Sequence, residues 1–206
     1  MTNRKMAGLA TGGVLTVLLL SACMPMVNPG FISMQPRKPG AVDFQVNAGS
    51  GYPYLGWGSV HVEPYATEKL SVPIGLLGSY PGAGAARVGL RYRMTPVLTL
   101  GGGVGGGFFA VEYSIDGDSD TAAGGFGLVD LELGLGRRWG KFALSFAFRP
   151  TYVIPTPMAY LPVEFGFAFY LSKAWAFTLL VNGGLVVSDG GVGGGFGGGI
   201  GVFGHL

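Results

Sequence analysis

Large apolar residues alternate with small or polar residues along most of this chain. In the stretch Val42–Ala48 every second residue is apolar, and the residues between are Asp43, Gln45 and Asn47. Because successive side chains of a β-strand point to opposite faces, this period of two predicts strands with one apolar face. No helix-length segment interrupts the pattern after Ala41. The expected strands are roughly 41–50, 56–65, 69–79, 85–95, 97–113, 121–137, 141–153, 159–171, 175–187 and 191–204.

An alternating sheet buries its apolar face either inward, in a soluble sandwich or barrel, or outward, against lipid. Opposite the large apolar residues lie mainly Gly, Ala and Ser with a few charges, whereas a solvent-facing surface carries many charged and polar residues. The expected connections alternate between longer loops (51–55, 114–120 and 153–158) and tight turns (95–96, 138–140 and 172–174). These features predict an all-β fold, a single antiparallel up-and-down transmembrane β-barrel of about ten strands. Eight strands and a periplasmic β-sandwich are the alternatives.

Aromatic residues gather near both expected ends of the strands. Amphipathic rings favour the membrane–water interface and so predict two girdles, although strands are rich in aromatic residues in general. The residues concerned are Tyr52, Tyr54, Trp57, Tyr80, Tyr113 and Tyr152 near the longer loops, and Trp139, Tyr170 and Trp175 near the tight turns. In this pattern the segment 41–206 resembles the small outer-membrane β-barrel proteins of bacteria. It departs from them at the C-terminus, because many such barrels end on an aromatic residue and this chain ends on Leu206.

A short apolar run follows Arg4 and Lys5 and ends at Leu20-Ser21-Ala22-Cys23. This arrangement resembles the lipobox of bacterial lipoproteins. The resemblance implies cleavage before Cys23, acylation of its thiol and amine by chains such as palmitate, and membrane lipids as partners. The alternatives are a secretory signal and a transmembrane helix, for which the run falls short of the ~20 apolar residues required. Cys23 is the sole cysteine, which excludes an internal disulfide.

The chain is therefore expected to consist of a signal peptide (1–22), an acylated cysteine with a tether (23–40) and a barrel domain (41–206). Repeated prolines at 25, 29, 36 and 39 predict a semi-rigid extended spacer. The basic pair Arg37-Lys38 is expected to be solvated, with contact to anionic lipid head groups as the alternative. Loss of Arg4 and Lys5 leaves 11 of the 13 basic residues against 11 acidic ones, and such a neutral chain has no electrostatic footprint for nucleic acid.

Six charged residues occupy positions that alternate with the large apolar residues, so they belong to the polar face of the sheet and are expected to lie in the lumen. Buried charges need partners, so this set predicts a salt-bridged lumen, with the selectivity constriction of a channel as the alternative. Alternate glycines at 101–107 and 193–201 leave either a cavity or room for bulky neighbours. The charge cluster consists of Arg87, Arg91, Arg93, Asp130, Glu132 and Glu164.

Several motif-like patterns predict no site. The G-x-G-x-x-G matches at 101–106 and 193–198 open no helix that would bind a phosphate. Asp116, Asp118 and Asp120 have the spacing of a calcium loop, but the glycine and glutamate that such a loop requires are replaced by Thr121 and Gly127. His61 and Glu63 share a strand face without a nucleophile beside them. We therefore expect no catalytic residue, metal or cofactor.

The combined expectation is a lipid-anchored outer-membrane β-barrel protein that has a structural or surface-interaction role through its exposed loops and no enzymatic activity. A loop-mediated surface partner is part of this expectation. The alternatives are a narrow passive channel for small solutes and a lipid-modifying outer-membrane enzyme. The pattern specifies neither the oligomeric state nor the identity of the partner.

Overall fold

The computed structural model describes residues 30–33, 35–52, 56–80, 82–115, 118–155, 158–189 and 191–206. Within these residues the chain forms twelve β-strands in one antiparallel sheet. No helix in this part is long and apolar enough to cross a membrane. The strands are β1 (Val42–Tyr52), β2 (Gly56–Pro64), β3 (Leu70–Ser71), β4 (Ile74–Tyr80), β5 (Ala83–Thr95), β6 (Leu98–Ile115), β7 (Asp118–Trp139), β8 (Phe142–Phe148), β9 (Thr151–Ile154), β10 (Met158–Tyr170), β11 (Trp175–Ser188) and β12 (Gly191–His205).

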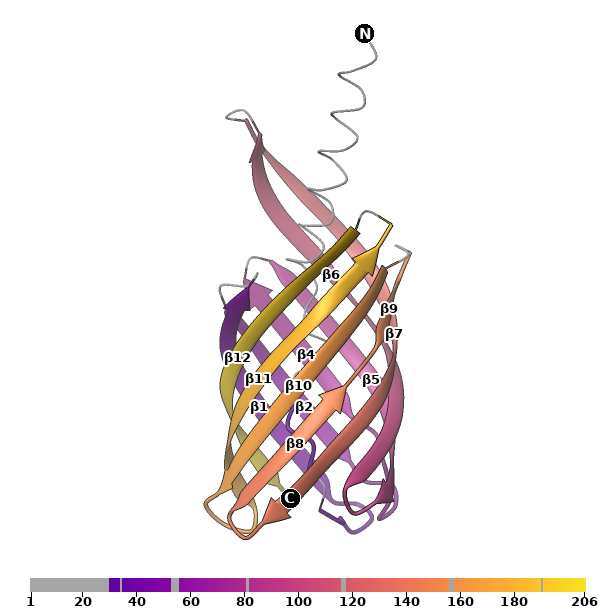
Figure 1. Ribbon diagram of the computed structural model, residues 1–206, viewed down its shortest axis with the longest axis vertical. Coiled ribbons are helices and arrows are strands. Elements are labelled where there is room, and N and C mark those ends of the chain that lie inside the picture. The colour runs from indigo at the N-terminus through magenta and orange to yellow at the C-terminus, as the bar shows by residue number, and fades with distance from the viewer. Residues whose placement is uncertain are drawn as a thin grey trace.

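The sheet closes into a barrel because β12 pairs with both β11 and β1 (Figure 1). Two positions in the wall each hold two short strands. β3 and β4 both pair with β5, while β8 and β9 both pair with β7 and β10. Pro73 and Pro150 lie at the two interruptions, because proline has no N–H to donate to the ladder. The barrel therefore has ten strand positions, as predicted, and the alternatives of eight strands and of a sandwich are wrong.

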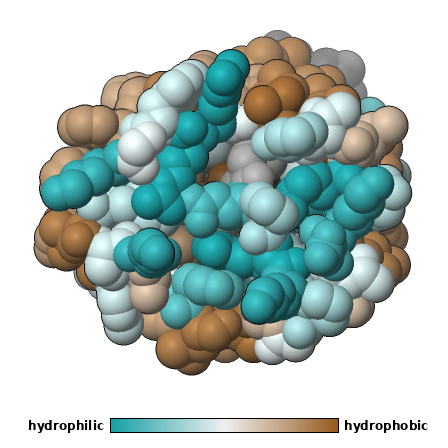
Figure 2. Space-filling view, turned by 90° about the horizontal axis from the view of Figure 1, so that it is seen from below, coloured by the Kyte–Doolittle hydropathy of each residue, from teal (hydrophilic) through white to brown (hydrophobic). Residues whose placement is uncertain are grey.

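The outer surface is apolar and the inner surface is polar. Leu131 in β7 is 69% exposed, whereas its neighbour Asp130 is 3% exposed. Phe167 and Ala168 in β10 differ in the same way. When the barrel is viewed from its C-terminal end, hydrophilic residues gather at the centre and most of the hydrophobic ones lie toward the margin (Figure 2). The apolar residues thus face outward, as a lipid-facing surface requires.

Strands β6 and β7 form a hairpin that rises above the rest of the wall (Figure 1). β5 pairs with β6 only as far as Phe109, and β9 pairs with β7 only from Gly127. Beyond the base, the strand pairing in the described residues joins these two strands only to each other, from Ala110↔Ala123 to Ile115↔Asp118. We call this end of the barrel the hairpin end, and the opposite end, where β1 begins and β12 finishes, the C-terminal end.

Tight turns join β5 to β6 and β7 to β8, close to the expected positions 95–96 and 138–140, but the connections expected to be longer loops are shorter than predicted. β6 continues to Ile115 and β7 starts at Asp118, so most of the expected loop 114–120 is strand. At the C-terminal end, the connection between β2 and β3 runs over 65–69 and is not tight. Polar residues such as Ser114 and Ser119 are typical of a loop, but in the structure they pair with each other across the hairpin.

Candidate functional site

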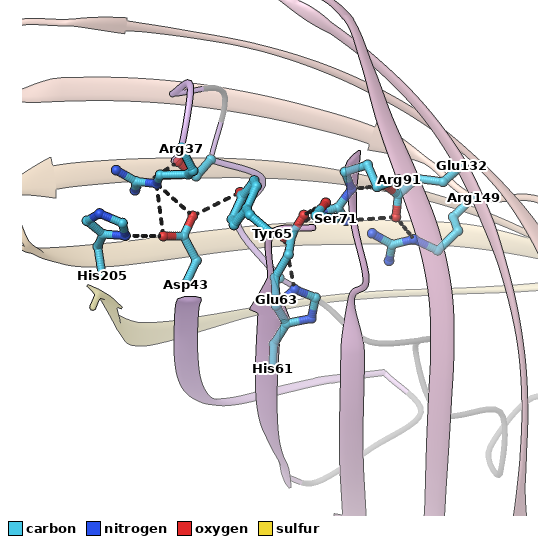
Figure 3. A network of polar contacts seen from close by, with 12 residues as sticks. Arg37, Asp43, His61, Glu63, Tyr65, Ser71, Arg91, Glu132, Arg149 and His205 are labelled. Carbon is cyan, nitrogen blue, oxygen red and sulfur yellow. Dashed lines mark hydrogen bonds and ion pairs between the residues drawn. The ribbon is translucent and has the colours of Figure 1, made fainter. Parts of the chain in front are cut away.

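A network of ion pairs crosses the lumen (Figure 3). Arg91 in β5 donates to both carboxylate oxygens of Glu132 in β7, with Nε–Oε1 and Nη2–Oε2 distances of 2.5 and 3.0 Å. Arg91 also bonds Glu63 in β2, which accepts from the hydroxyl of Ser71 at 2.5 Å. Arg149 donates to Glu132 from the other side, with an Nε–Oε2 distance of 2.8 Å. Strands that are distant in the sequence are thereby tied together through the interior.

A second buried ion pair joins Arg87 of β5 to Asp130 of β7. The guanidinium and carboxylate meet in the bidentate arrangement, with Nε–Oδ2 and Nη2–Oδ1 distances of 2.6 and 2.5 Å. Arg93 behaves differently. Its guanidinium donates to the backbone carbonyls of Glu68, at 3.2 Å, and of Gln35, and no ion pair joins it to a described carboxylate.

Residues 30–33 and Arg37, which precede β1, lie inside the barrel. The backbone N of Gly30 donates to Oε1 of Glu164 in β10 at 3.0 Å. Phe31 packs edge-on against Phe203 of β12, with ring centroids 5.9 Å apart, and Ile32 is 1% exposed. We call residues 30–33 and 35–37 the lumen segment. Glu164 thus meets this segment, whereas the other two predicted acidic residues bond arginines of β5.

The described part of the expected tether therefore does not form a spacer outside the barrel. Arg37 is buried and donates from Nε to Oδ2 of Asp43 at 3.2 Å, so it is neither solvated nor free for lipid head groups. Lys38 is exposed. The prolines indicate an extended backbone, but the sequence pattern does not specify which surface that backbone lies on. Cys23 lies outside the described residues.

Asp43 forms a polar cluster where the lumen segment joins β1 (Figure 3). Besides Arg37, the hydroxyl of Tyr65 donates to its Oδ2 at 3.0 Å, and Nδ1 of His205 lies 2.9 Å from its Oδ1. The cluster joins the lumen segment, the start of β1 and the end of β12. It closes the C-terminal end of the wall with charged hydrogen bonds, which are stronger than neutral ones.

The lumen-facing glycines make room for bulky neighbours. A Cβ added to Gly103 would lie 2.8 Å from Cζ of Arg87, and one added to Gly199 would lie 2.6 Å from Cζ2 of Trp57. Real Cβ atoms do not approach other atoms so closely. The alternate glycines at 101–107 and 193–201 thus allow large side chains from adjacent strands to lie flat against the wall. Room for bulky neighbours was one of the two interpretations of this pattern.

Two of the expected girdle residues face the lumen instead. Trp57 and Tyr170 are 6% and 2% exposed, and Tyr170 stacks edge-on against Phe203 at 6.2 Å. The sequence indicates this for Trp57, because it lies four residues from the lumen residue His61 in the same strand and so points to the same face. The exposed aromatic residues of the expected girdles are Tyr80, Tyr152, Trp139 and Trp175. Tyr54 and the side chains of Tyr52 and Tyr113 lie outside the described residues.

The remaining sequence patterns occupy structural positions. His61 is buried, with Nε2 3.4 Å from Oε2 of Glu63. Both glycine-rich motifs lie within strands, in β6 and β12. Asp116 and the side chains of the neighbouring acidic residues lie outside the described part. Among the residues that the structure describes, no group of three or more His, Cys, Asp or Glu is arranged to hold a metal ion.

Several residues of the network were not in the predicted cluster. Glu63 and Arg149 bridge to Arg91 and Glu132, and Asp43 holds Arg37. The available signal was parity, because Glu63 and Arg149 alternate with apolar residues as the predicted residues do. Parity places a residue on the inner face, but the pairing partner depends on how far the strands are staggered around the barrel.

The two ends of the barrel differ in charge. The lysines of the described chain are all at the C-terminal end, where each is exposed: Lys38, Lys69, Lys141 and Lys173. The hairpin end carries acidic positions in its strands and connections, namely Glu112, Asp118, Asp120 and Asp189.

Comparison of the sequence with protein-family models gives no match. Comparison with curated protein sequences gives no match either. Among solved structures, the outer membrane protease OmpT from Escherichia coli aligns with a TM-score of 0.53 and 11% identity, over 84% of this chain and 100% of that one. The chain has an outer-membrane β-barrel fold. The N-terminal β-barrel domain of OprF from Pseudomonas aeruginosa aligns with a TM-score of 0.43 and 9% identity, over 82% and 100%. At 11% identity the likeness to OmpT concerns the fold alone.

Proposed function

We propose that this chain is a lipid-anchored outer-membrane β-barrel protein with a structural or surface-interaction role, exerted through its hairpin end. The apolar exterior supports insertion into a membrane. The extended β6–β7 hairpin supports an outward orientation of that end, because outer-membrane barrels have short periplasmic turns and longer extracellular connections. Acylation of Cys23 would add a second attachment to the membrane, since two acyl chains are enough for stable anchoring.

The observation that carries this proposal is the filled lumen. Arg91, Glu132 and Arg149 cross the interior as buried ion pairs, and Phe31 and Ile32 of the lumen segment are buried in apolar clusters of the same interior. An aqueous channel needs polar groups that exchange their partners for water or a passing solute. Groups paired with each other at 3.0 Å or less are poorly suited to that. The filled lumen therefore favours a structural or interactive role over a passive channel.

Conductance in planar bilayers tests this conclusion. The purified mature protein is expected to give no single-channel steps, because the ion pairs and the lumen segment occupy the interior. A variant that lacks residues 30–37 serves as the matched control, and small steps are expected from it. Regular steps from the unaltered protein would support the narrow-channel alternative instead.

The lipid anchor has its own test. Cys23→Ser is expected to abolish acylation and to leave the precursor uncleaved by the lipoprotein peptidase. Mass spectrometry of the mature wild-type protein should find an acylated N-terminal cysteine. An unmodified N-terminus at another residue would contradict the anchor without affecting the barrel.

We propose no enzymatic activity. In the lumen His61 is 5% exposed beside Glu63, and so buried a side chain offers little access to a membrane lipid. Incubation of the purified protein with lipid A, followed by mass spectrometry of the lipid, tests the enzyme alternative. Release of acyl chains by wild type but not by His61→Gln would support that alternative.

A further inference from the structure

The outer wall has a hollow near the C-terminal end, where β8, β10 and β11 lie side by side (Figure 1). Its volume is about 450 Å³, within the range of roughly 300–1,000 Å³ that ligand sites occupy. Its floor is the strand backbone at Ala143 and Ala168, whose side chains are buried. Two rows of outward-facing apolar residues border it, namely Phe142, Phe169 and Phe177 near the turns, and Leu144, Phe167 and Leu179 farther from them. The hollow is open and apolar, as an acyl chain requires.

A charged residue faces outward beside this hollow. Among the strand residues whose side chains the structure describes, Arg137 in β7 is the only charged one on the lipid-facing surface. It is exposed, and in the sheet register it lies opposite Leu144, which lines the hollow. Its Cζ is 5.6 Å from the ring centroid of Trp139, another residue of the lining. A charge on a membrane-facing surface is costly unless it reaches a partner at the interface.

Two exposed lysines lie at the same edge of the barrel. Lys141 is in the β7–β8 turn, and Lys173 is in the β10–β11 connection. These turns are adjacent, because the backbone N of Tyr170 at the end of β10 donates to the carbonyl of Lys141 at 2.7 Å. No ion pair joins Arg137 or either lysine to a described carboxylate. The sequence has no Asp or Glu in 133–163 or in 165–188, so these strands and turns contribute cations alone.

The apolar hollow and the basic edge together fit one class of ligand. A planar guanidinium binds a phosphate through two parallel hydrogen bonds, and a lysine adds a mobile point charge. Basic residues at the membrane surface attract anionic head groups, while an apolar surface below them takes up the attached chain. A second copy of this chain is a poorer occupant, because a two-fold contact through this surface would bring like charges together.

We propose that this surface is a binding site for an anionic phospholipid, with an acyl chain in the hollow and the phosphate at Arg137, Lys141 and Lys173. The site gives the barrel a preference for one kind of membrane lipid at its C-terminal end. It goes beyond the proposed role of the hairpin end, and it depends neither on the lipid anchor nor on the orientation of the barrel.

Native mass spectrometry of the purified mature protein tests the site. The protein is released from micelles that contain equal amounts of phosphatidylglycerol and phosphatidylcholine. Retention of phosphatidylglycerol is expected to exceed that of phosphatidylcholine by about fivefold for each basic residue that contacts the phosphate. The double change Lys141→Gln and Lys173→Gln should remove most of this preference. Lys38→Gln with Lys69→Gln removes the same charge from the other exposed lysines of this end and should preserve it.

The apolar part of the site has a separate pair of variants. Leu179→Trp fills the hollow with a larger apolar side chain, so retention of phosphatidylglycerol should fall several-fold although no charge changes. Leu185→Trp is the matched control, because Leu185 is on the same face of β11 outside the hollow and is similarly exposed. Unchanged retention in Leu179→Trp would overturn the placement of the acyl chain.

The other outcomes also decide the proposal. An equal loss of preference in both lysine double variants would show general attraction to a charged surface and overturn a defined site. Stronger retention of lipid A than of phosphatidylglycerol would identify another source of the phosphate and overturn the assignment to a phospholipid. Dimers in place of bound lipid would overturn it in favour of a second copy.

Tryptophan fluorescence gives an independent measurement if the charge variants fail to fold. In Trp175→Phe the outward-facing tryptophan that remains is Trp139, at the hollow, because Trp57 is buried in the lumen. Its quenching in phosphatidylcholine vesicles should be stronger with brominated phosphatidylglycerol than with an equal fraction of brominated phosphatidylcholine. In Trp139→Phe, which keeps Trp175, the two lipids should differ less. Equal quenching of Trp139 by both lipids would overturn the site.

Discussion

At the scale of single residues, Glu132 holds the lumen network together. Its two carboxylate oxygens accept from Arg91 and Arg149, and its side chain is 1% exposed. Arg91 in turn reaches Glu63. Removing one member of a buried ion pair leaves the others uncompensated, which costs far more than losing an exposed pair. The stability of the barrel should therefore depend strongly on this one carboxylate.

The change Glu132→Gln keeps the shape of the side chain and removes its charge. We expect the free energy of unfolding to fall by about 3–5 kcal/mol, because Arg91 and Arg149 lose their shared counter-charge. Urea unfolding of the protein in lipid vesicles, followed by tryptophan fluorescence, measures this. Glu68→Gln, at an exposed turn, is the control and should change it by less than ~1 kcal/mol. Equal effects of the two changes would show that the network contributes no more than a surface pair.

A pair of glycines gives a second residue-scale prediction. Gly103→Ala places a methyl group 2.8 Å from Cζ of Arg87 and 2.7 Å from the carbonyl oxygen of Val88, whereas a Cβ at Gly78 meets nothing within 4 Å. We expect Gly103→Ala to lower the free energy of unfolding by about 1–3 kcal/mol through displacement of Arg87. Gly78→Ala should be neutral or slightly stabilising. The same urea titration distinguishes them, and a neutral Gly103→Ala would mean that the wall relaxes around the methyl group.

Parity explains which residue placements were predictable. Asp130 and Glu132 alternate with Val129 and Leu131, so their inward direction follows from a period of two alone. The alternation of β2 also places Trp57 on the inner face, because Trp57 lies an even number of residues from His61. Nearness to a strand end alone does not show which face an aromatic residue occupies. That Arg91 contacts Glu63 rather than Glu164 depends on the stagger of strands around a closed wall, which no local pattern contains.

At the scale of elements, the two strands of the β6–β7 hairpin extend beyond the wall that supports them. In the described residues its outer part pairs only with itself, and residues 114–120 at its tip were expected to be a loop rather than strand. A hairpin with two free edges is ready to pair with another strand. This feature supports the proposal that a surface partner binds through this hairpin.

Replacing residues 111–122 by Asn-Gly tests the independence of this hairpin from the barrel. Ala110 and Ala123 are opposite each other in the register, so a two-residue turn joins them. We expect the shortened protein to fold and to keep its unfolding midpoint, because no other strand pairs with the described residues of the removed part. The measurement is heat-dependent mobility in detergent together with urea unfolding. A large loss of stability would show that the hairpin supports the wall.

The lumen segment was the element least accessible to sequence reasoning. The repeated prolines predicted an extended spacer, and they contain no information on whether that spacer lies inside or outside the barrel. Phe31 and Ile32 are the residues that suggest burial, since two large apolar side chains are unusual in a solvated spacer. Their site of burial is formed by residues such as Phe203 and Ala147, which follow more than 100 positions later.

At the scale of the whole molecule, the barrel turns its apolar residues toward its surroundings, and a membrane explains this. Leu131→Arg places a charge on the outer face and should lower the free energy of unfolding in lipid vesicles by about 2–4 kcal/mol if that face lies at mid-membrane depth. Leu206→Arg, at the exposed end of the chain, is the matched control and should be close to neutral. A neutral Leu131→Arg would contradict a lipid-facing wall.

The closure of the wall also dictates an order of assembly. β1 pairs with β12 from Asp43↔His205 to Tyr52↔Phe196. The first strand to be synthesised therefore cannot complete its pairing until the last strand has been made. Until then β1 and the growing sheet have open edges, and such distant pairings form slowly. Because the lumen segment lies within the finished wall, it must be in place before the seam between β1 and β12 is sealed, or be drawn through afterwards. Sealing that seam commits the lumen segment to the interior for the lifetime of the fold.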